Sequence, residues 1–266
     1  MLPQVNIINC KDAKYMLFNT RDLISNKLYQ EGVWDETSLT LSRFFIQNVD
    51  TPLLLDVGAN LGAYSIPLAR DIQDRGGLVY GFEPQRIVFY QLCGNVLLNR
   101  LENYFAFNYA IGAENSTIDL PAMNYEANTN VGVFSINQEM RSALGVELYT
   151  SDLSSFSVSM ITLDSLKVQK SPSLIKIDVE GYELNVLKGA VKFLEEHNYP
   201  ALLFEAWNSL EWFAPQRIQL LKFIEDLGYK ISLNIADEYV AQHPKNSVSI
   251  VFTTADNGVI TMHREK

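Results

Sequence analysis

Four stretches of the sequence that resemble buried strands end in a carboxylate. These strand-ending acids are Asp56, Glu83, Asp178 and Glu205. In an open α/β sheet, ligands bind outside the carboxyl ends of the parallel strands. Carboxylates on that edge would accept hydrogen bonds from hydroxyl groups and attract cations. Acids also end strands and cap helices for purely structural reasons, so that alternative stays open for the set.

The first of these acids opens a glycine-containing loop, Asp56-Val-Gly58-Ala-Asn60-Leu-Gly62. Glycine lets a ligand approach the backbone closely, and a helix that starts there points its N–H groups at the ligand. A dinucleotide loop has the pattern G-x-G-x-x-G, which is absent here, and Asp56 would repel a pyrophosphate. An ammonium group near Asp56 and a ribose diol near Glu83 fit better, and S-adenosylmethionine carries both. A structural tight turn is the alternative.

Strands and helices must alternate around these motifs to bring the acids together. We expect strands at 53–57, 77–82, 104–110, 174–177, 201–204, 230–234 and 247–252. We expect helices from about 63, at 85–99, at 180–197 and at 216–227. Such alternation favours right-handed crossovers and a mostly parallel sheet. The last two strands have no helix between them, which suggests an antiparallel pair at one edge.

The domain organisation follows from the same pattern. Residues 1–50 are predicted to form a helical cap segment, and residues 51–266 a single domain. Within that domain, the polar stretch at about 115–159 is predicted to be an insertion of hairpin and loop. Its length makes it a candidate for substrate contact, because long loops in compact domains are usually functional or disordered.

Composition excludes several classes of protein. The chain has 266 residues and a net charge of −10, without a dense Lys/Arg tract, so we expect no nucleic-acid partner. Cys10 and Cys93 are far apart, and no secretory signal is visible, which favours a reducing, cytoplasmic location. No apolar run approaches the roughly 20 residues that cross a bilayer, so no stable membrane insertion is expected.

Several motifs together resemble the FkbM-type methyltransferases. They are Leu55-Asp-Val-Gly-Ala-Asn-Leu-Gly62 with Ser65, Phe82-Glu83-Pro84, Asn95 with Asn99, Asn108-Tyr-Ala-Ile-Gly112, and Ile175-Lys-Ile-Asp-Val-Glu-Gly-Tyr-Glu183 with Leu187-Lys-Gly-Ala190. The resemblance extends from about residue 36 to residue 205. It implies an α/β, class I methyltransferase (Rossmann-like) fold, with a seven-stranded, mostly parallel sheet, an antiparallel last strand and helices on both faces. It also implies S-adenosylmethionine as methyl donor, S-adenosylhomocysteine as product and, usually, a hydroxyl of a sugar or secondary metabolite as acceptor.

The resemblance also implies roles for individual residues. The loop from Asp56 to Gly62 would hold the methionine part of the cofactor, Glu83 the ribose, and Asn108 with Ala110 the region near the adenine. Glu36 matches a family glutamate before the first strand and is expected to close over the cofactor. The full set expected at the cofactor is Glu36, Asp56, Gly58, Asn60, Gly62, Ser65, Glu83, Pro84, Asn108, Ala110 and Asp178.

A hydroxyl acceptor is a poor nucleophile until a base removes its proton. Asp178 and Glu180 follow the fourth strand and are the candidates for this base. Lys176 lies two residues before Asp178, on the same strand face, and completes the expected catalytic set. Glu180 could instead cap a helix. His243, on a loop between the last strands, is a weaker candidate for the base.

A divalent metal is possible but not required. Asp178, Glu205 and Asn208 offer oxygen ligands that could bind a metal and lower the pKa of the acceptor. Residues 115–159, the N-terminal segment and residues 207–216 would recognise the acceptor, but they carry no specific signature. In the last of these segments, Trp207, Trp212 and Phe213 could stack on a flat substrate or belong to the core.

Other functions remain open at this stage. An NAD(P)-dependent oxidoreductase on a similar sheet would need a third glycine in the loop and no acid before it, and the sequence has the opposite. A non-catalytic binding protein could keep the same fold, although the loop from Gly58 to Gly62 together with Glu83 argues against a decayed site. A nucleic-acid methyltransferase is disfavoured by the acidic net charge. No pattern indicates the oligomeric state.

Overall fold

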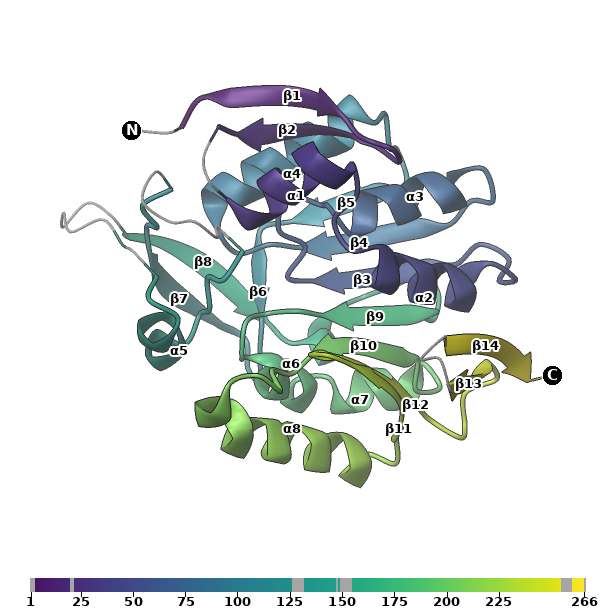
Figure 1. Ribbon diagram of the computed structural model, residues 1–266. Coiled ribbons are helices and arrows are strands. Elements are labelled where there is room, and N and C mark those ends of the chain that lie inside the picture. Colours follow the sequence, from purple (N-terminus) through teal and green to yellow (C-terminus); the bar gives the residue numbers. More distant parts are fainter. Residues whose placement is uncertain are drawn as a thin grey trace.

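The computed structural model describes residues 3–19, 22–125, 132–146, 148, 155–254 and 260–265. Its centre is a seven-stranded sheet with the strand order β11-β12-β10-β9-β3-β4-β5 (Figure 1). The strands are β3 (Leu53–Val57), β4 (Leu78–Phe82), β5 (Tyr104–Phe107), β9 (Leu174–Ile177), β10 (Ala201–Glu205), β11 (Lys230–Ile235) and β12 (Glu238–Gln242). Neighbours from β5 to β10 pair in parallel, and β12 is antiparallel to both of its neighbours. The predicted mostly parallel sheet with an antiparallel last strand is confirmed.

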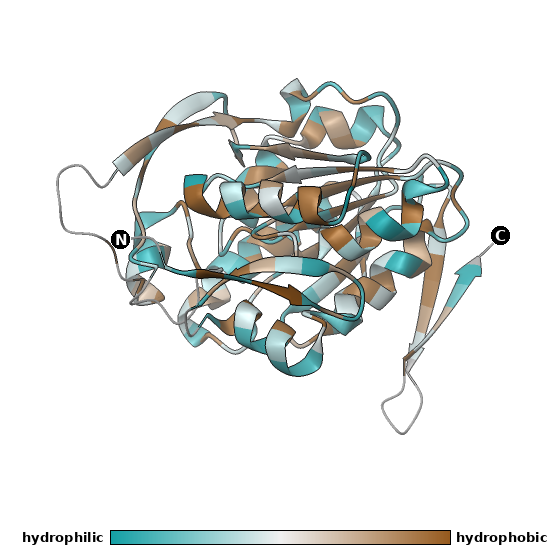
Figure 2. Cartoon of the chain, turned by 90° about the horizontal axis from the view of Figure 1, so that it is seen from above, coloured by the Kyte–Doolittle hydropathy of each residue, from teal (hydrophilic) through white to brown (hydrophobic). Residues whose placement is uncertain are grey.

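Helices cover both faces of this sheet, as predicted (Figure 1). One face packs against α1 (Leu23–Glu31), α2 (Glu36–Ile46), α3 (Ser65–Gln73) and α4 (Arg86–Leu98). The other face packs against α6 (Glu183–Lys188), α7 (Val191–Glu196) and α8 (Ala214–Asp226). Strand β3 feeds both cores, because Leu54 belongs to the first apolar cluster and Leu53 and Leu55 to the second. Figure 2 shows the hydrophobic residues gathered on these central strands.

The sheet has one topological switch point, between β3 and β9. From β3 the chain moves outward through β4 to β5, and it later returns to β9 on the other side of β3. The two connections therefore leave β3 and β9 in opposite directions and open a crevice at the carboxyl ends of these strands. All five residues of β3 are buried, so this strand fixes the floor of the crevice.

Residues 1–50 are not helical throughout, which corrects the predicted helical segment. They also contain β1 (Val5–Asn9) and β2 (Lys14–Phe18), an antiparallel hairpin beside α4. Side chains of α4 hold the edge of β2. Asn95 Oδ1 accepts a 2.6 Å hydrogen bond from Met16 N, and Asn99 bonds both the N–H and the C=O of Lys14. These two asparagines of the recognised motif therefore attach the N-terminal hairpin to the domain.

The end of the chain also differs from the prediction. The seventh strand of the sheet is β12, for which the sequence predicts no strand. The strand expected at 247–252 is β13 (Ser249–Thr254), which pairs with β14 (Ile260–Glu265) in a separate hairpin. Figure 2 shows this hairpin projecting from the body of the protein near the C-terminus.

Two further elements are divided. The helix expected at 180–197 is split into α6 and α7 at Gly189, where a Cβ atom would clash with the Gly112 carbonyl. The strand expected at 104–110 is split into β5 and β6. The second sheet has the order β6-β8-β7 and consists of β6 (Tyr109–Ile111), β7 (Ser116–Pro121) and β8 (Ser155–Ile161).

The inserted segment contains the expected hairpin, because β7 and β8 pair antiparallel. Its described part also includes α5 (Gln138–Ala143), and the short helices η1 (Leu163–Ser165) and η2 (Glu211–Phe213) follow later in the chain. The longest described helices have 13 residues, and in the described ranges no helix could cross a membrane.

Candidate active site

A cavity of about 420 Å³ lies over the carboxyl ends of β3, β4, β9 and β10, at the switch point of the sheet. Most of the residues predicted for the site line it. These are Asp56, Gly58, Asn60, Glu83, Pro84, Ala110, Lys176, Asp178, Glu180, Glu205 and Trp207. Four predicted cofactor residues do not, namely Glu36, Gly62, Ser65 and Asn108. The strand-ending acids therefore meet at one cavity, as the sequence predicted.

The loop after β3 is built on two glycines with different roles. Gly58 has a φ of +90°, and a Cβ atom there would clash with the backbone carbonyl of Asp178. The loop can therefore lie directly against the end of β9. Gly62 also has a positive φ, +87°, but a Cβ atom there would meet the side chains of Ile66 and Leu92. Gly62 thus permits helix packing, and Gly58 joins the two strands that flank the crevice.

Glu83 fixes this loop from the neighbouring strand. Its Oε2 accepts a 3.0 Å hydrogen bond from Asn60 N, and its Oε1 accepts a 2.8 Å bond from Gln85 N. Asn60 has a φ of +50°, an uncommon conformation for a residue other than glycine. Burial raises the pKa of Glu83 to about 8, against the effect of the two N–H groups. Each carboxylate oxygen keeps a lone pair for a ligand hydroxyl in the cavity.

The predicted residues outside the lining act behind it. Asn108 Nδ2 donates to the carbonyl oxygens of Glu83 (2.8 Å) and Pro84 (3.0 Å), so it fastens the turn that presents Glu83. The buried Ser65 hydroxyl hydrogen-bonds the Tyr104 hydroxyl. Glu36 is exposed in the first turn of α2, and it is its neighbour in the chain, Asp35, that lines the cavity.

Asp56 is a buried carboxylate that faces the cavity without a protein partner of normal hydrogen-bond length. Its exposed fraction is 1%, and within the described chain neither of its oxygens has a hydrogen-bond partner. Burial raises the pKa of Asp56 to about 6, against opposing effects of Lys176 and the nearby Ser65 hydroxyl. Leaving a buried carboxylate without a partner is costly. An ammonium group of a bound ligand would supply the missing donors.

Lys176 and Asp178 form a short ion pair on β9. Their Nζ and Oδ2 atoms lie 2.6 Å apart, with the lysine side chain 6% exposed and the aspartate 31% exposed. The ammonium also lies 5.1 Å from the centre of the Tyr64 ring. Burial lowers the pKa of Lys176, but Asp178, Glu238 and Asp56 outweigh it and hold that pKa well above its usual range. Lys176 is therefore a fixed positive charge in the cavity.

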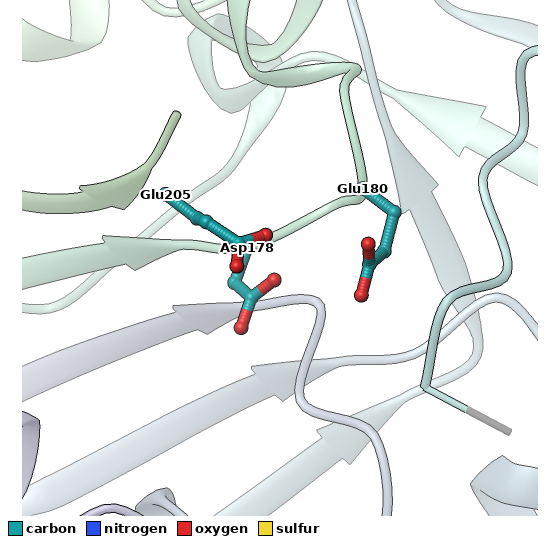
Figure 3. A group of neighbouring side chains, drawn as sticks. All are labelled: Asp178, Glu180 and Glu205. Carbon is teal, nitrogen blue, oxygen red and sulfur yellow. The ribbon is translucent and has the colours of Figure 1, made fainter. Parts of the chain in front are cut away.

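Two glutamates complete the acidic wall. Carboxylate oxygens of Asp178, Glu180 and Glu205 all lie within 4.8 Å of one another, and Figure 3 shows the three side chains converging from two strand ends. Burial, followed by the charge of Asp178, raises the pKa of both Glu180 and Glu205 well above the usual range. Each of these two glutamates thus holds a proton more tightly than an exposed carboxyl group.

The structure does not bring together the three metal ligands suggested by the sequence. Asn208 accepts a 2.6 Å hydrogen bond from the Tyr239 hydroxyl and donates to the Ala236 carbonyl oxygen, so its side chain is engaged away from Asp178 and Glu205. A cluster of acidic side chains alone does not make a metal site.

Several residues of the cavity were missed by sequence reasoning. Glu238, on β12, is the cross-strand partner of Glu205, and burial raises its pKa to about 7. Lys27 and Trp34 from the N-terminal segment and Phe134 from the insertion also line the cavity. The only available signal for Glu238 was its place in a strand, and that strand was not recognised.

Of the predicted histidine and aromatic candidates, only Trp207 is among the described residues that line the cavity. His243 stacks on Tyr199 with ring centres 3.9 Å apart and does not line the cavity. Trp207 does line it, whereas Trp212 and Phe213 pack behind Trp207. His243 thus belongs to an aromatic cluster away from the acids, and one of the three aromatic candidates reaches the site.

The family of this chain follows from its similarity to a known protein family. The model of the Methyltransferase FkbM domain matches residues 56–231 of this sequence. The chain belongs to the FkbM methyltransferase family. It therefore has a class I methyltransferase fold, and the cofactor of this family is S-adenosylmethionine, as the sequence motifs predicted. The Asp56 carboxylate, which has no hydrogen-bond partner within the described chain, fits the ammonium group of S-adenosylmethionine. The buried Glu83 fits its ribose. A search of curated proteins finds no match.

Solved structures of similar proteins match this chain at low sequence identity. The FkbM methyltransferase of Methylobacillus flagellatus KT is 20% identical, with a TM-score of 0.48, over 72% of this chain and 43% of its own. A SAM-dependent O-methyltransferase of Thermotoga maritima is 11% identical (TM-score 0.47), over 98% and 71% of the two chains. A precorrin-6y C5,15-methyltransferase of Geobacter metallireducens GS-15 is 13% identical (TM-score 0.42), over 85% and 81%. The FkbM chain thus spans 43% of the length of its Methylobacillus relative.

Proposed function

We propose that this FkbM methyltransferase is an O-methyltransferase that acts in the cytoplasm on a hydroxyl group of a small molecule, such as a sugar or a secondary metabolite. The observation that carries the proposal is the carboxylate pair Asp178 and Glu180 beside the cofactor loop. A hydroxyl acceptor needs a proton acceptor at this place, and these side chains supply one.

The cofactor would be held by the β3–β4 side of the cavity. Asp56 would accept the ammonium group and Glu83 the ribose hydroxyls, and Asn60 with Gly58 would contact the methionine part. When bound, the sulfonium supplies an activated methyl group for in-line displacement. The protein then contributes mainly by positioning the acceptor, which can supply much of the rate.

The proton of the acceptor would pass to Asp178 and Glu180. Lys176 holds one oxygen of Asp178 at 2.6 Å and thereby fixes the direction in which its carboxylate points. Burial, followed by the charge of Asp178, raises the pKa of Glu180, so a proton accepted by the pair would rest on Glu180. Lys176 acts in this scheme as an orienting charge rather than a base.

The rest of the wall supports an uncharged, hydroxylated acceptor. Aromatic side chains of Trp34, Trp207 and Phe134 offer flat apolar surfaces. Two lysines line the cavity, Lys27 and Lys176. They face eight carboxylates: Asp35, Asp56, Glu83, Asp178, Glu180, Glu205, Asp237 and Glu238. Two lysines among so many acidic side chains offer little positive charge to a phosphate backbone, which disfavours nucleic acid as the acceptor.

Two experiments test this proposal. Calorimetric titration with S-adenosylmethionine, S-adenosylhomocysteine and NAD should show binding of the first two, and binding of NAD alone would overturn the cofactor assignment. Transfer of a tritiated methyl group to a panel of sugars, phenols, amines and thiols should then label the hydroxyl compounds. Labelling confined to amines or thiols would contradict O-methylation.

The role of Asp178 has its own test. Asp178→Asn should lower turnover by about 100-fold or more, the contribution of a general base, while affinity for S-adenosylhomocysteine, which is neutral at sulfur, changes by less than about threefold, because the amide keeps the size of the side chain. The matched control is Asp226→Asn, at an exposed aspartate paired with Lys222 on α8, which should leave turnover unchanged. Full turnover in Asp178→Asn would remove this residue from the catalytic pair.

A further inference from the structure

The turn that carries the catalytic pair has an unusual backbone. It connects β9 to α6, and two successive residues in it are left-handed: Glu180 with a φ of +56° and Gly181 with a φ of +86°. Glycine adopts this conformation freely, but a glutamate does so only when its surroundings enforce it. A relaxed turn would point the Glu180 side chain elsewhere, so something must hold the turn.

Glu183 is the side chain that holds it. Its Oε1 accepts hydrogen bonds of 3.1 Å from both Val179 N and Gly181 N, the two amides on either side of Glu180. Glu183 is 2% exposed, so water would not replace these bonds easily if the side chain were removed. An acid in the first turn of a helix is common, but this oxygen serves amides of the preceding turn.

The rest of the turn is fixed by neighbouring elements. Asp178 N donates a 2.9 Å hydrogen bond to the Val57 carbonyl, and Gly58 packs against the Asp178 carbonyl. On the other side, Gly181 lies against Met140 of the insertion and Phe213. The start of the turn is thus tied to the cofactor loop, and Glu183 alone bridges the two amides that flank Glu180.

We propose that Glu183 is a positioning residue, which acts through the turn to aim Asp178 and Glu180 at the place of methyl transfer. This inference rests on the proposed function, since it assumes that the pair faces the sulfonium of the cofactor. Glu183 does not line the cavity and has no contact with the reacting atoms. Its hydrogen bonds act through two backbone amides, and its charge also contributes to the raised pKa of Glu180 and Glu205.

The chemistry of the two bonds suggests a conservative variant. Burial raises the pKa of Glu183 to about 7, and a carboxyl oxygen accepts hydrogen bonds in both protonation states. Glutamine offers the same Oε1 acceptor at the same distance from the backbone. Glu183→Gln should therefore keep the turn, whereas Glu183→Met has nearly the same size but lacks an oxygen acceptor.

The test compares two ligands that differ in charge. S-adenosylmethionine carries a positive sulfonium, and S-adenosylhomocysteine is neutral at that sulfur, so aimed carboxylates should favour the first. By calorimetry, Glu183→Met should lose about tenfold of this preference, as expected for a displaced opposite charge, with S-adenosylhomocysteine affinity kept within about twofold. Glu183→Gln should keep the wild-type preference. Hydrogen exchange at the amides of Val179 and Gly181 should speed up only in Glu183→Met.

Each result of these measurements either supports or contradicts the positioning role of Glu183. A wild-type chain that binds neither ligand refutes the proposed function, whereas one that binds both equally overturns the orientation on which the inference rests. An unchanged preference in folded Glu183→Met also overturns it. If Glu183→Met does not fold, Glu183→Gln remains decisive, because a lost preference with protected amides in that variant would contradict the positioning role.

Discussion

The two halves of the cavity differ in how Glu83 on one side and the acids on the other are surrounded. On the cofactor half, at β3 and β4, both oxygens of Glu83 accept backbone N–H groups and so hold the loop at Asn60. On the acceptor half, at β9, β10 and β12, Glu180 and Glu205 face other carboxylates, and Lys176 pairs with Asp178. Glu83 on the cofactor half is thus fixed by its own hydrogen bonds, whereas Asp56 beside it and the carboxyl groups of the acceptor half leave oxygens for a ligand.

The halves also differ in how the chain assembles them. The cofactor half comes from two consecutive strands and their loops, within residues 53–85. The acceptor half draws on the N-terminal segment, the insertion, and the strand ends from β9 to β12. Its side chains are brought together only by the complete fold. The cofactor half is therefore a local sequence motif, whereas the acceptor half is formed only when the whole chain has folded.

The largest expected effect is at the contact that joins the two halves. Gly58→Ala would force a Cβ atom into the Asp178 carbonyl at a φ of +90°, so we expect a loss of about 3 kcal/mol in the free energy of unfolding and no measurable S-adenosylmethionine binding. Urea unfolding and calorimetry would measure these. Gly145 has a φ of +67° and open space around its Cα, so Gly145→Ala should cost only about 1–2 kcal/mol. Equal costs would show that the two halves are not in close contact at Gly58.

A smaller effect should distinguish the halves directly. Glu83→Ala leaves the amides of Asn60 and Gln85 without their acceptor, and S-adenosylhomocysteine affinity should fall about 30-fold, as expected when two buried hydrogen bonds are lost. Glu205→Ala should change that affinity by less than about threefold, because Glu205 lies on the acceptor half. Calorimetry on both variants would measure this. If both variants weaken binding equally, the division of the cavity into two halves is wrong.

The smallest effect concerns pH. Burial raises the pKa of Glu83 to about 8 and of Glu183 to about 7, so between about pH 4.5 and pH 8 the folded ligand-free chain holds protons that the unfolded chain releases. Stability therefore falls as pH rises through this window. We expect Tm to be about 3 °C lower at pH 8 than at pH 6, measured by thermal unfolding.

The variant Glu83→Gln shows which half of the cavity causes the fall of Tm with rising pH. Glu83→Gln cannot titrate, so its Tm should depend less on pH between 7 and 8 than that of the wild type. A slope unchanged in Glu83→Gln would move the responsible groups to the acceptor half. A Tm that rises from pH 6 to pH 8 in the wild-type chain would contradict the protonated state of Glu83 itself.

The cofactor half was predictable because its signals are local. The acid at position 56, the glycines after it and Glu83 could be read from short stretches of sequence, and the structure places Asp56, Gly58 and Glu83 at the cavity. A motif match does not tell which way a side chain points. Gly62 and Asn108 occupy motif positions, yet the first allows α3 and α4 to pack and the second fastens the Glu83 turn.

The strands that were not predicted have no recognisable signal in the local sequence. β11 and β12 are joined at Ala236 and Asp237, where Ala236 takes a φ of +55° without the glycine or asparagine that usually marks a hairpin. The stretch from 247 to 252 has a stronger apolar alternation, so it was preferred as the seventh strand. The β1–β2 hairpin was missed because Asn95 and Asn99, far away in the sequence, satisfy its edge.

The placement of the aromatic wall has a spectroscopic consequence. The sequence contains three tryptophans. Trp34 and Trp207 line the cavity, and Trp212 lies 5.9 Å from Trp207 between ring centres. The intrinsic fluorescence of the whole chain therefore originates at the acceptor half, with the Lys27 ammonium 5.4 Å from the centre of the Trp34 ring. Unlabelled compounds can thus be screened as acceptors by the change that they cause in this emission, before any product is identified.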